Sequence, residues 1–281
     1  MTRLPIEFCV MLEPKKSLGQ VFLCDTNLLE RVAKLAEPRG RIIVEIGAGD
    51  GRLTALLARD AALVYAVEMD KGLYQRLNER FNGSPNVIPV CRDARELDLN
   101  EAAFSLASNE RVRVVGNLPY CSFVHILLAL MNQLDRIDDI RVMGQREMAE
   151  RLMAAPNTPE YGRLAVTVQV RTNVRRLLTA PRAAFWPRPK VDSTVVAMTP
   201  RKPVLGSKEA LKRFDEFVTA AFAHRRKTLI NSLSQSDAFR DQREVVGRLL
   251  TQSGMSIACR PQEIAVDEYV SLFERLVSIV G

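Results

Sequence analysis

The segment Asn117-Leu118-Pro119-Tyr120 carries groups that suit a flat heterocycle with an exocyclic amine. The Asn117 side chain and the Leu118 backbone each offer a carbonyl oxygen that accepts hydrogen bonds, and Tyr120 offers a ring face for stacking. The apolar residues Val112, Val114 and Val115 come shortly before the segment and predict a short buried strand, which Pro119 cannot continue. We therefore expect these four residues at the carboxyl end of a strand, where open α/β sheets place their sites. A plain strand-to-loop turn with Tyr120 in the core is the alternative interpretation.

Three other predicted strand ends carry residues that suit a nucleoside. The buried run 41–46 leads into Gly47 and Gly49, where backbone can approach a ligand closely and a following helix presents free amides. Glu68 ends the next strand and could bind two ribose hydroxyls, and Asp93 follows a third strand and could meet an adenine ring. A pyrophosphate-containing cofactor is disfavoured, because the turn lacks the usual third glycine.

These strand ends are expected on one rim of a sheet, because the carboxyl ends of parallel strands face the same edge. Together they describe a nucleoside-containing cofactor whose reactive group points at Asn117. A nicotinamide-dependent dehydrogenase would share the glycine turn and the acid after the second strand. It would give no reason for the sequence of residues 117–120.

The composition is that of an ordinary globular protein. Of 281 residues, 47% are hydrophobic and 26% are charged, and the formal net charge of +7 favours a polyanionic partner without identifying it. Two histidines, and five cysteines without paired spacing, predict no metal site. Neither a signal peptide nor a membrane-length apolar stretch is evident, so we expect a cytoplasmic protein without membrane contact.

A change of composition near residue 200 predicts two domains. Residues 1–14 are interpreted as an N-terminal extension, 15–200 as an α/β domain, 201–207 as a linker rich in proline and glycine, and 208–281 as a small helical domain. The last domain is expected to contain helices over residues 208–224, 225–233, 241–252 and 267–280.

Several basic residues could contact a nucleic acid, although an ordinary solvated surface is the alternative for each of them. They are Lys15, Lys16, Arg188, Lys190, Arg225, Arg226 and Lys227. In the same α/β domain, the alternation of residues 165–170 predicts a strand. Phe185, in a proline-rich loop, could stack on a target base or anchor the loop in the core.

Taken in order, these motifs resemble the small-subunit ribosomal RNA adenine dimethyltransferases over roughly residues 15 to 275. The matching blocks are Lys15-Lys16 with Gly19-Gln20 and Phe22-Leu23, Glu45-Ile46-Gly47 with Gly49, Leu53-Thr54, Glu68 with Asp70, Asp93-Ala94, Asn117 to Tyr120, Gln145 with Glu147 and Arg151, Tyr161 to Leu164, Phe185 with Pro187, Pro189 to Val191, Ser193, and Arg225 to Thr228. Blocks this numerous, in one order, do not arise by coincidence.

The resemblance implies an α/β fold: a Rossmann-like methyltransferase domain with a seven-stranded, mostly parallel sheet, followed by a small C-terminal α-helical domain that helps to hold RNA. It also implies that S-adenosylmethionine donates two methyl groups to the 6-amino group of each of two adjacent adenosines. These adenosines would lie near the 3′ end of small-subunit ribosomal RNA, so the partner would be that RNA or a precursor of the small subunit. A monomer with a role in small-subunit biogenesis is expected.

The resemblance also assigns roles to individual residues. The catalytic segment would be Asn117, Leu118, Pro119 and Tyr120, with Tyr120 stacking on the target base. The residues expected to bind the cofactor are Val21, Leu23, Gly47, Gly49, Glu68, Asp93 and Asn117.

The chain departs from the family pattern at two positions. Bacterial members often have asparagine where this chain has Val21, so only a backbone contact is expected there, and Cys121 replaces a frequent asparagine or glutamine. Val21, Cys24 and Val64-Tyr65 look nearer the archaeal branch. The alternatives that stay open are a methyltransferase acting on large-subunit RNA and a largely non-catalytic assembly or RNA-binding factor.

Overall fold

The computed structural model describes residues 14–15, 18–104, 106, 110–224 and 226–280. The described chain forms two compact units, one made of residues up to 149 with 174–200, and the other made of residues 150–173 with 201 onward. Residues 150–173, which the sequence analysis assigned to the first domain, therefore group with the C-terminal helices. The described residues include no helix that is both long and apolar enough to cross a membrane.

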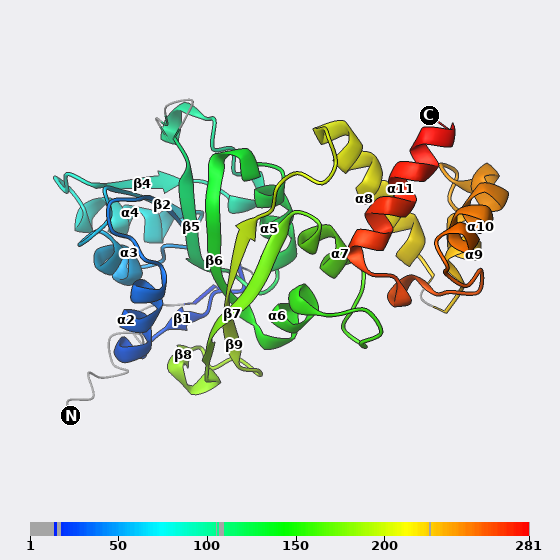
Figure 1. The fold of residues 1–281 in the computed structure, drawn as a ribbon. Helices are drawn as coiled ribbons and strands as arrows, with labels where there is room; N and C mark the ends of the chain where they lie inside the picture. The colour runs from blue at the N-terminus through cyan, green and yellow to red at the C-terminus, as the bar shows by residue number, and fades with distance from the viewer. Residues whose placement is uncertain (1–13, 16–17, 105, 107–109, 225, 281) are drawn as a thin grey trace. The chain divides into compact units, whose positions relative to one another are not determined.

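A seven-stranded sheet forms the centre of the first unit, in the order β4-β3-β2-β5-β6-β9-β7 (Figure 1). Its strands are β2 Ile42–Ile46, β3 Leu63–Glu68, β4 Val87–Cys91, β5 Val112–Asn117, β6 Ile137–Gln145, β7 Thr172–Ala180 and β9 Ser193–Pro200. The first five strands in the order run parallel, and β9 pairs antiparallel with β6. The expected mostly parallel sheet of seven strands is confirmed.

The central strands are buried on both faces because helices cover the sheet. In β2, Ile43, Val44 and Ile46 are at most 1% exposed. The helices of this part of the chain are α2 Thr26–Leu35, α3 Arg52–Leu57, α4 Lys71–Arg80, α5 Phe123–Met131 and α6 Arg146–Met153. Asp25 caps α2 by accepting a hydrogen bond from the Leu28 amide at 2.9 Å.

The strand order reverses between β2 and β5, and this is where open α/β sheets bind ligands. The chain moves outward from β2 to β3 and β4 on one side, and from β5 to β6 on the other. Ile46 lies opposite Gly116, and a Cβ atom added to Gly116 would lie only 2.4 Å from the Ile46 carbonyl oxygen. Glycine at position 116 therefore allows β5 to pair closely with β2 directly before Asn117.

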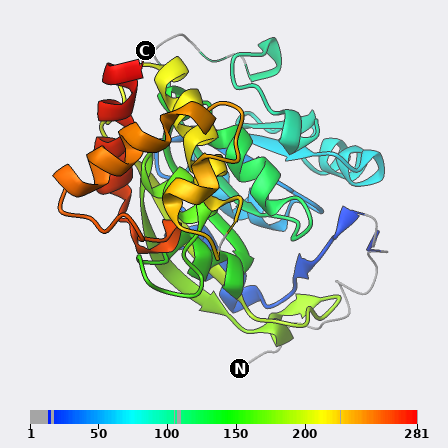
Figure 2. The same ribbon diagram turned by 90° about the vertical axis from the view of Figure 1, so that its right-hand side faces the viewer.

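A second, two-stranded sheet holds the N-terminal segment to the first unit. The strands β1 Phe22–Leu23 and β8 Phe185–Trp186 pair antiparallel, with Leu23 opposite Phe185. Figure 2 shows this blue strand beside the yellow-green segment of β8. The pairing fixes residues that precede the first helix against a loop more than 150 residues later.

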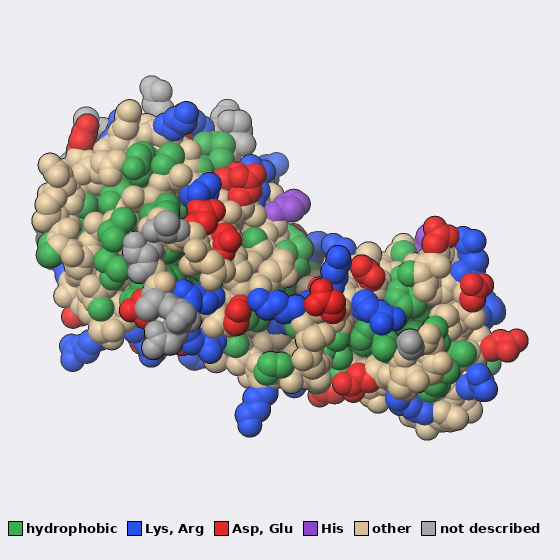
Figure 3. All heavy atoms as spheres, turned by 90° about the horizontal axis from the view of Figure 1, so that it is seen from above, with side chains coloured by type: hydrophobic (Ala, Val, Ile, Leu, Met, Phe, Trp, Pro, Cys, Tyr) green, Lys and Arg blue, Asp and Glu red, His purple; other side chains and the backbone are tan. Residues whose placement is uncertain are grey.

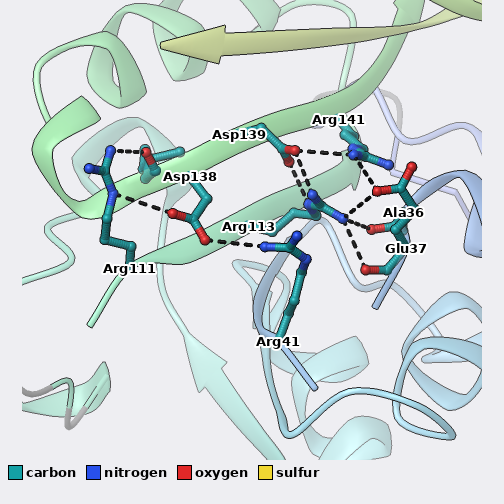
Figure 4. Close-up of polar contacts among 9 residues, drawn as sticks. Ala36, Glu37, Arg41, Arg111, Arg113, Asp138, Asp139 and Arg141 are labelled. Atoms are coloured by element: carbon teal, nitrogen blue, oxygen red, sulfur yellow. Dashed lines mark hydrogen bonds and ion pairs between the residues drawn. The ribbon is translucent and has the colours of Figure 1, made fainter. Parts of the chain in front are cut away.

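Charged side chains join the end of α2 to the amino-terminal halves of β5 and β6 (Figure 4), and of these Glu37 is exposed whereas Arg113, Asp139 and Arg141 are buried. Arg113 donates to the Asp139 carboxylate at 2.5 Å and to the Ala36 carbonyl oxygen at 2.7 Å. Arg141 donates to Glu37 at 2.8 Å and to Asp139 at 3.1 Å. We call Glu37, Arg113, Asp139 and Arg141 the ionic cluster.

The second unit is helical and has its own aromatic core. Its helices are α7 Arg163–Gln169, α8 Lys208–Phe222, α9 Leu229–Leu233, α10 Arg243–Gln252 and α11 Val266–Val280. The Phe273 ring packs against Phe214 and Phe217, with centroids 5.4 and 5.7 Å away. The buried Tyr161 hydroxyl donates to the Ile264 carbonyl oxygen at 2.8 Å.

Two sequence-based expectations about secondary structure were wrong, and one strand was missed. Residues 165–170 are not a strand but lie mostly within helix α7, because their valines and alanine pack on both flanks of that helix and tertiary packing outweighs their β propensity. Strand β7, which carries Arg175 and Arg176, was not predicted. The helix expected from residue 225 begins at Leu229, where the Thr228 hydroxyl caps it by accepting from the Asn231 amide at 3.4 Å.

Candidate active site

A cavity of about 1080 Å³, including its open mouth, lies at the carboxyl ends of β2, β3 and β5. Its walls come from residues 18–23, the glycine turn after β2, the end of β3, Asp93 after β4, and residues 117–119. Each of the residues expected to bind a cofactor lines this cavity: Val21, Leu23, Gly47, Gly49, Glu68, Asp93 and Asn117.

Glu68 is held at the base of the cavity by two backbone amides. Its carboxylate accepts from the Gly49 amide and from the Asp70 amide, both at 2.9 Å. Gly49 has φ of +60°, a left-handed conformation that glycine adopts without strain and that turns its amide towards Glu68. Burial raises the pKa of Glu68, and the two amides oppose that rise. Each carboxylate oxygen keeps a second lone pair, so the group can accept two further hydrogen bonds from neighbouring hydroxyls.

Asp93 presents an ionised acceptor at the opposite wall. Its carboxylate caps the short 3₁₀ turn Ala94–Glu96 by accepting from the Arg95 amide at 2.9 Å. The Arg95 guanidinium also pairs with it, with an N–O distance of 2.5 Å, and this pairing lowers the pKa of Asp93. The group therefore stays charged at neutral pH and can accept from an amine.

Asn117 ends β5 with its amide group in a fixed orientation. The side-chain Nδ2 donates to the Val21 carbonyl oxygen at 2.7 Å, which leaves the side-chain oxygen as the acceptor. The following turn is also held, because the Leu118 amide donates to the Met143 carbonyl oxygen at 3.0 Å and the Ser122 amide to that of Pro119 at 3.1 Å. The residues 117–119 thus form a fixed edge of the cavity.

Tyr120 lies beside the cavity and is not among the residues that line it. Its hydroxyl group and the Ser193 hydroxyl on β9 share a hydrogen bond of 2.7 Å, which holds the half-buried ring at this edge. Burial raises the pKa of Tyr120, so its hydroxyl stays protonated at neutral pH.

The stacking role predicted for Phe185 does not agree with its position. Phe185 is 4% exposed, packs in the hydrophobic core and pairs through its backbone with Leu23. This burial favours the alternative, a loop anchor in the core, and the stacking role stays a prediction. The sequence could not decide between the two, because an aromatic residue beside prolines suits both.

The basic residues expected to bind RNA differ in their surroundings. Lys15 forms an ion pair with Asp70 at an N–O distance of 2.7 Å. Arg188, Lys190, Arg226 and Lys227 are exposed, whereas Lys16 and Arg225 lie outside the described residues. On the face in Figure 3, basic side chains alternate with acidic ones and do not form one continuous basic surface.

The sequence analysis did not identify Glu45 as a site residue. Glu45 is 1% exposed and lines the cavity, and its carboxylate accepts from the Thr54 hydroxyl at 2.5 Å. Burial raises its pKa to about 8, against the opposing effect of the Thr54 hydrogen bond. The available signal was a single acid within the apolar strand 43–46.

We expect Glu45 to make the stability of the protein fall as pH rises from about 4.5 to about 8. In this window the folded protein keeps the Glu45 proton while the unfolded chain has lost it, so the folded state binds more protons. Between pH 6 and pH 8 the Glu45 contribution should amount to about 2 kcal/mol. Glu45→Gln mimics the protonated side chain, so urea unfolding at pH 6, 7 and 8 should show a flatter pH dependence than in the unchanged protein. An identical slope in both proteins would contradict this assignment.

Comparison with known proteins decides the family. The profile of the family described as "Ribosomal RNA adenine dimethylase" matches residues 11–276. The chain belongs to this family. The protein named "Ribosomal RNA small subunit methyltransferase A" from Bacillus thuringiensis (strain Al Hakam) is 38% identical over 267 residues, which cover 94% of this chain and 91% of the relative. The protein of the same name from Bacillus cytotoxicus is also 38% identical, over 268 residues.

Solved structures support the same fold. The crystal structure of the 23S rRNA methyltransferase ErmE is 26% identical, has a TM-score of 0.66 and covers 91% of this chain and 99% of that chain. A dimethyladenosine transferase from Plasmodium falciparum is 21% identical, has a TM-score of 0.75 and covers 89% of this chain and 95% of that chain. The latter likeness concerns the fold.

This adenine dimethylase is an S-adenosylmethionine-dependent methyltransferase, and its cavity has features that fit that cofactor. Glu68 keeps acceptor sites beyond those that receive the Gly49 and Asp70 amides, and Asp93 carries an ionised acceptor at the cavity wall. Gly47 lies close to the backbone of Asn117, since an added Cβ would be 3.3 Å from the Asn117 carbonyl oxygen, so a larger residue at position 47 would crowd the end of β5. The Bacillus relatives named above are bacterial, and they do not support the expectation that this chain is nearer to the archaeal branch of the family.

Proposed function

We propose that this dimethylase transfers methyl groups from S-adenosylmethionine to the 6-amino groups of two adjacent adenosines near the 3′ end of small-subunit ribosomal RNA. The observation that carries the chemistry is the position of Asn117, whose side-chain oxygen is an acceptor at the cavity edge. The choice of RNA is supported by the names of relatives that are 38% identical over 94% of this chain.

Cofactor binding uses the residues of the cavity wall. Glu68 accepts the ribose hydroxyls, Asp93 and its neighbours bind the adenine, and the turn at Gly47 and Gly49 packs on the methionine part. Val21 contributes only through its backbone and apolar side chain, and Leu23 covers the ligand. When bound, S-adenosylmethionine supplies an electrophilic methyl group on a sulfonium centre, so transfer needs alignment more than a strong base.

The segment of residues 117–120 prepares the target amine. The lone pair of an adenine amine is delocalised into the ring, which makes the nitrogen a weak nucleophile. The Asn117 side-chain oxygen and the Leu118 carbonyl oxygen accept the two amine hydrogens, which favours a pyramidal nitrogen with its lone pair directed into the cavity. Pro119 sets the turn that presents the Leu118 carbonyl, and Tyr120 stacks on the base from the edge where Ser193 holds it.

A base within paired RNA could not reach this edge, so the target adenosine is single-stranded or turned out of its helix. The exposed side chains of Arg188, Lys190, Arg226 and Lys227 contact phosphates of the RNA. The protein acts as a monomer in the cytoplasm on small-subunit RNA or a precursor of the small subunit.

The decisive experiment incubates the protein and labelled S-adenosylmethionine with three separate substrates: small subunits lacking the modification, bare small-subunit RNA, and large subunits. The modified nucleosides are identified by mass spectrometry. We expect dimethyladenosine in small-subunit RNA alone. If the protein binds S-adenosylmethionine but transfers no labelled methyl group to any RNA, the protein acts as an assembly factor and not as a methyltransferase.

A methyltransferase acting on large-subunit RNA is the second candidate. It is favoured by the likeness to the structure described as a 23S rRNA methyltransferase, which is 26% identical with a TM-score of 0.66. This function ranks second because the relatives named as small-subunit methyltransferases are more similar to this chain, with 38% identity. If labelled methyl groups appear only in large subunits in the same experiment, the proposed methyl transfer is correct and the target is large-subunit RNA.

A further inference from the structure

The stretch Leu18–Val21 forms a wall of the cofactor cavity between the ends of β3 and β5. On the β5 side, the Val21 carbonyl oxygen accepts from Asn117, and Gly19 lies against Cys121, whose sulfur would be 2.8 Å from an added Cβ at position 19. On the β3 side, the attachment is made by polar side chains. Both ends of this wall are thus fixed to strands that carry site residues.

Asp70 makes the attachment on the β3 side. Its Oδ2 accepts from the Lys15 ammonium at 2.7 Å and from the Gln20 side-chain amide at 3.3 Å. The Gln20 side-chain oxygen also accepts from the Lys15 backbone amide at 2.9 Å, so a hydrogen bond joins the two residues that donate to Asp70. The Asp70 side chain is 3% exposed, and its other oxygen caps α4 by accepting from the Gly72 amide at 2.9 Å. The acceptor is therefore rigid, and the donors come from the wall.

The same residue positions the cofactor acid. The Asp70 backbone amide donates to Glu68, whose second oxygen accepts from Gly49. Asp70 thus connects the Lys15 ammonium to the Glu68 carboxylate, which is proposed to bind the ribose. Because Lys15 is already paired with an acid of its own chain, its charge is not free for a phosphate in this conformation.

We infer that Lys15 and Gln20 are cofactor-positioning residues, which act through Asp70 to hold residues 18–21 over S-adenosylmethionine. The inference rests on the proposed function only in taking that molecule as the ligand of the cavity. By this inference, Lys15 supports cofactor binding even when no RNA is present. The sequence had predicted a contact between Lys15 and an RNA phosphate instead.

The experiment measures the dissociation constant of S-adenosylmethionine by calorimetry without RNA. The variants are Lys15→Met, Lys15→Arg and Gln20→Ala, and Lys34→Met is the matched control, an exposed lysine of α2 outside the cavity wall. We expect Lys15→Met to weaken cofactor binding about fivefold, because its ion pair is half exposed. Lys15→Arg should restore most of the affinity, Gln20→Ala should weaken binding, and the control should not change it.

A double-variant test shows whether Lys15 acts through Asp70. Asp70→Asn keeps a side-chain oxygen for the α4 cap but loses the charge that Lys15 pairs with. Adding Lys15→Met to Asp70→Asn should cause no further loss of affinity. In methylation assays, Lys15→Met should raise the KM for S-adenosylmethionine while changing kcat little.

Two results would overturn the inference. The first is an unchanged cofactor dissociation constant in Lys15→Met together with a raised KM for RNA, which would make Lys15 a phosphate contact. The second is additive losses in the double variant, which would separate Lys15 from Asp70. Both readouts leave the proposed function intact, whereas failure of the unchanged protein to bind S-adenosylmethionine would overturn the function and this inference together.

Discussion

Asn117→Ala should lower kcat by at least about a thousandfold while changing the dissociation constant of S-adenosylmethionine by less than about tenfold. The variant removes the side-chain oxygen that accepts the target amine, and no other side chain of the cavity edge stands in for it. The modest effect on cofactor binding follows from the lost hydrogen bond to the Val21 carbonyl oxygen. Single-turnover methylation and calorimetric binding measure the two quantities separately.

Asn117→Asp and Asn132→Ala sharpen this test. Asn117→Asp keeps an acceptor but places a carboxylate oxygen against the Val21 carbonyl oxygen, so it should also be strongly impaired. Asn132, at the end of α5, is exposed and outside the cavity wall, and its replacement by alanine should leave kcat unchanged. Near-normal turnover in Asn117→Ala would remove the assignment of residues 117–120 as the catalytic segment.

Glu68→Ala should weaken S-adenosylmethionine binding by at least about a hundredfold. Each hydrogen bond to a charged acceptor contributes about 1.5–3 kcal/mol, and two ribose hydroxyls lose their acceptor together. The substitution also leaves the Gly49 and Asp70 amides without the carboxylate that holds them, so the turn loses its orientation. Equilibrium binding of S-adenosylmethionine and of S-adenosylhomocysteine, measured side by side, checks this expectation.

The two ligands share the ribose, so Glu68→Ala should weaken both to a similar extent. Glu68→Gln keeps one acceptor oxygen and should be intermediate, whereas Glu79→Ala, on the exposed face of α4, should bind both ligands normally. Thermal unfolding of each variant separates a loss of binding from a loss of folding. Unaltered affinity in a folded Glu68→Ala protein would disprove the ribose-binding role.

The sequence predicted the parallel strands and their ends well, because residues buried on both faces form short apolar runs bounded by glycine, acids or proline. The failure at residues 165–170 has a related cause. Alternating valine and threonine favour a strand locally, but the helix they form buries the same side chains, and only the packing of the second unit selects it.

Properties of the site that depend on distant contacts could not be predicted. The pairing of Lys15 with Asp70 joins residues far apart in the chain, and a lysine before a helix suits RNA equally well when its partner is unknown. The proton on Glu45 depends on complete burial, which a single acid in a strand does not reveal. Phe185 was ambiguous because its burial is decided by the pairing of β1 with β8.

The ionic cluster has a consequence for how the protein opens. Separating β5 from β6 would leave Arg113 and Asp139 charged and unpaired in a buried position, at a cost of about 3–5 kcal/mol. Separating the end of α2 from these strands would remove the Ala36 carbonyl oxygen that accepts from Arg113 and the Leu35 carbonyl oxygen that accepts from Arg141. The amides of these three elements should therefore exchange with solvent deuterium in one slow, cooperative event. Slow exchange in β5 would mean that a ligand enters and leaves the cavity without loosening the strand that carries Asn117.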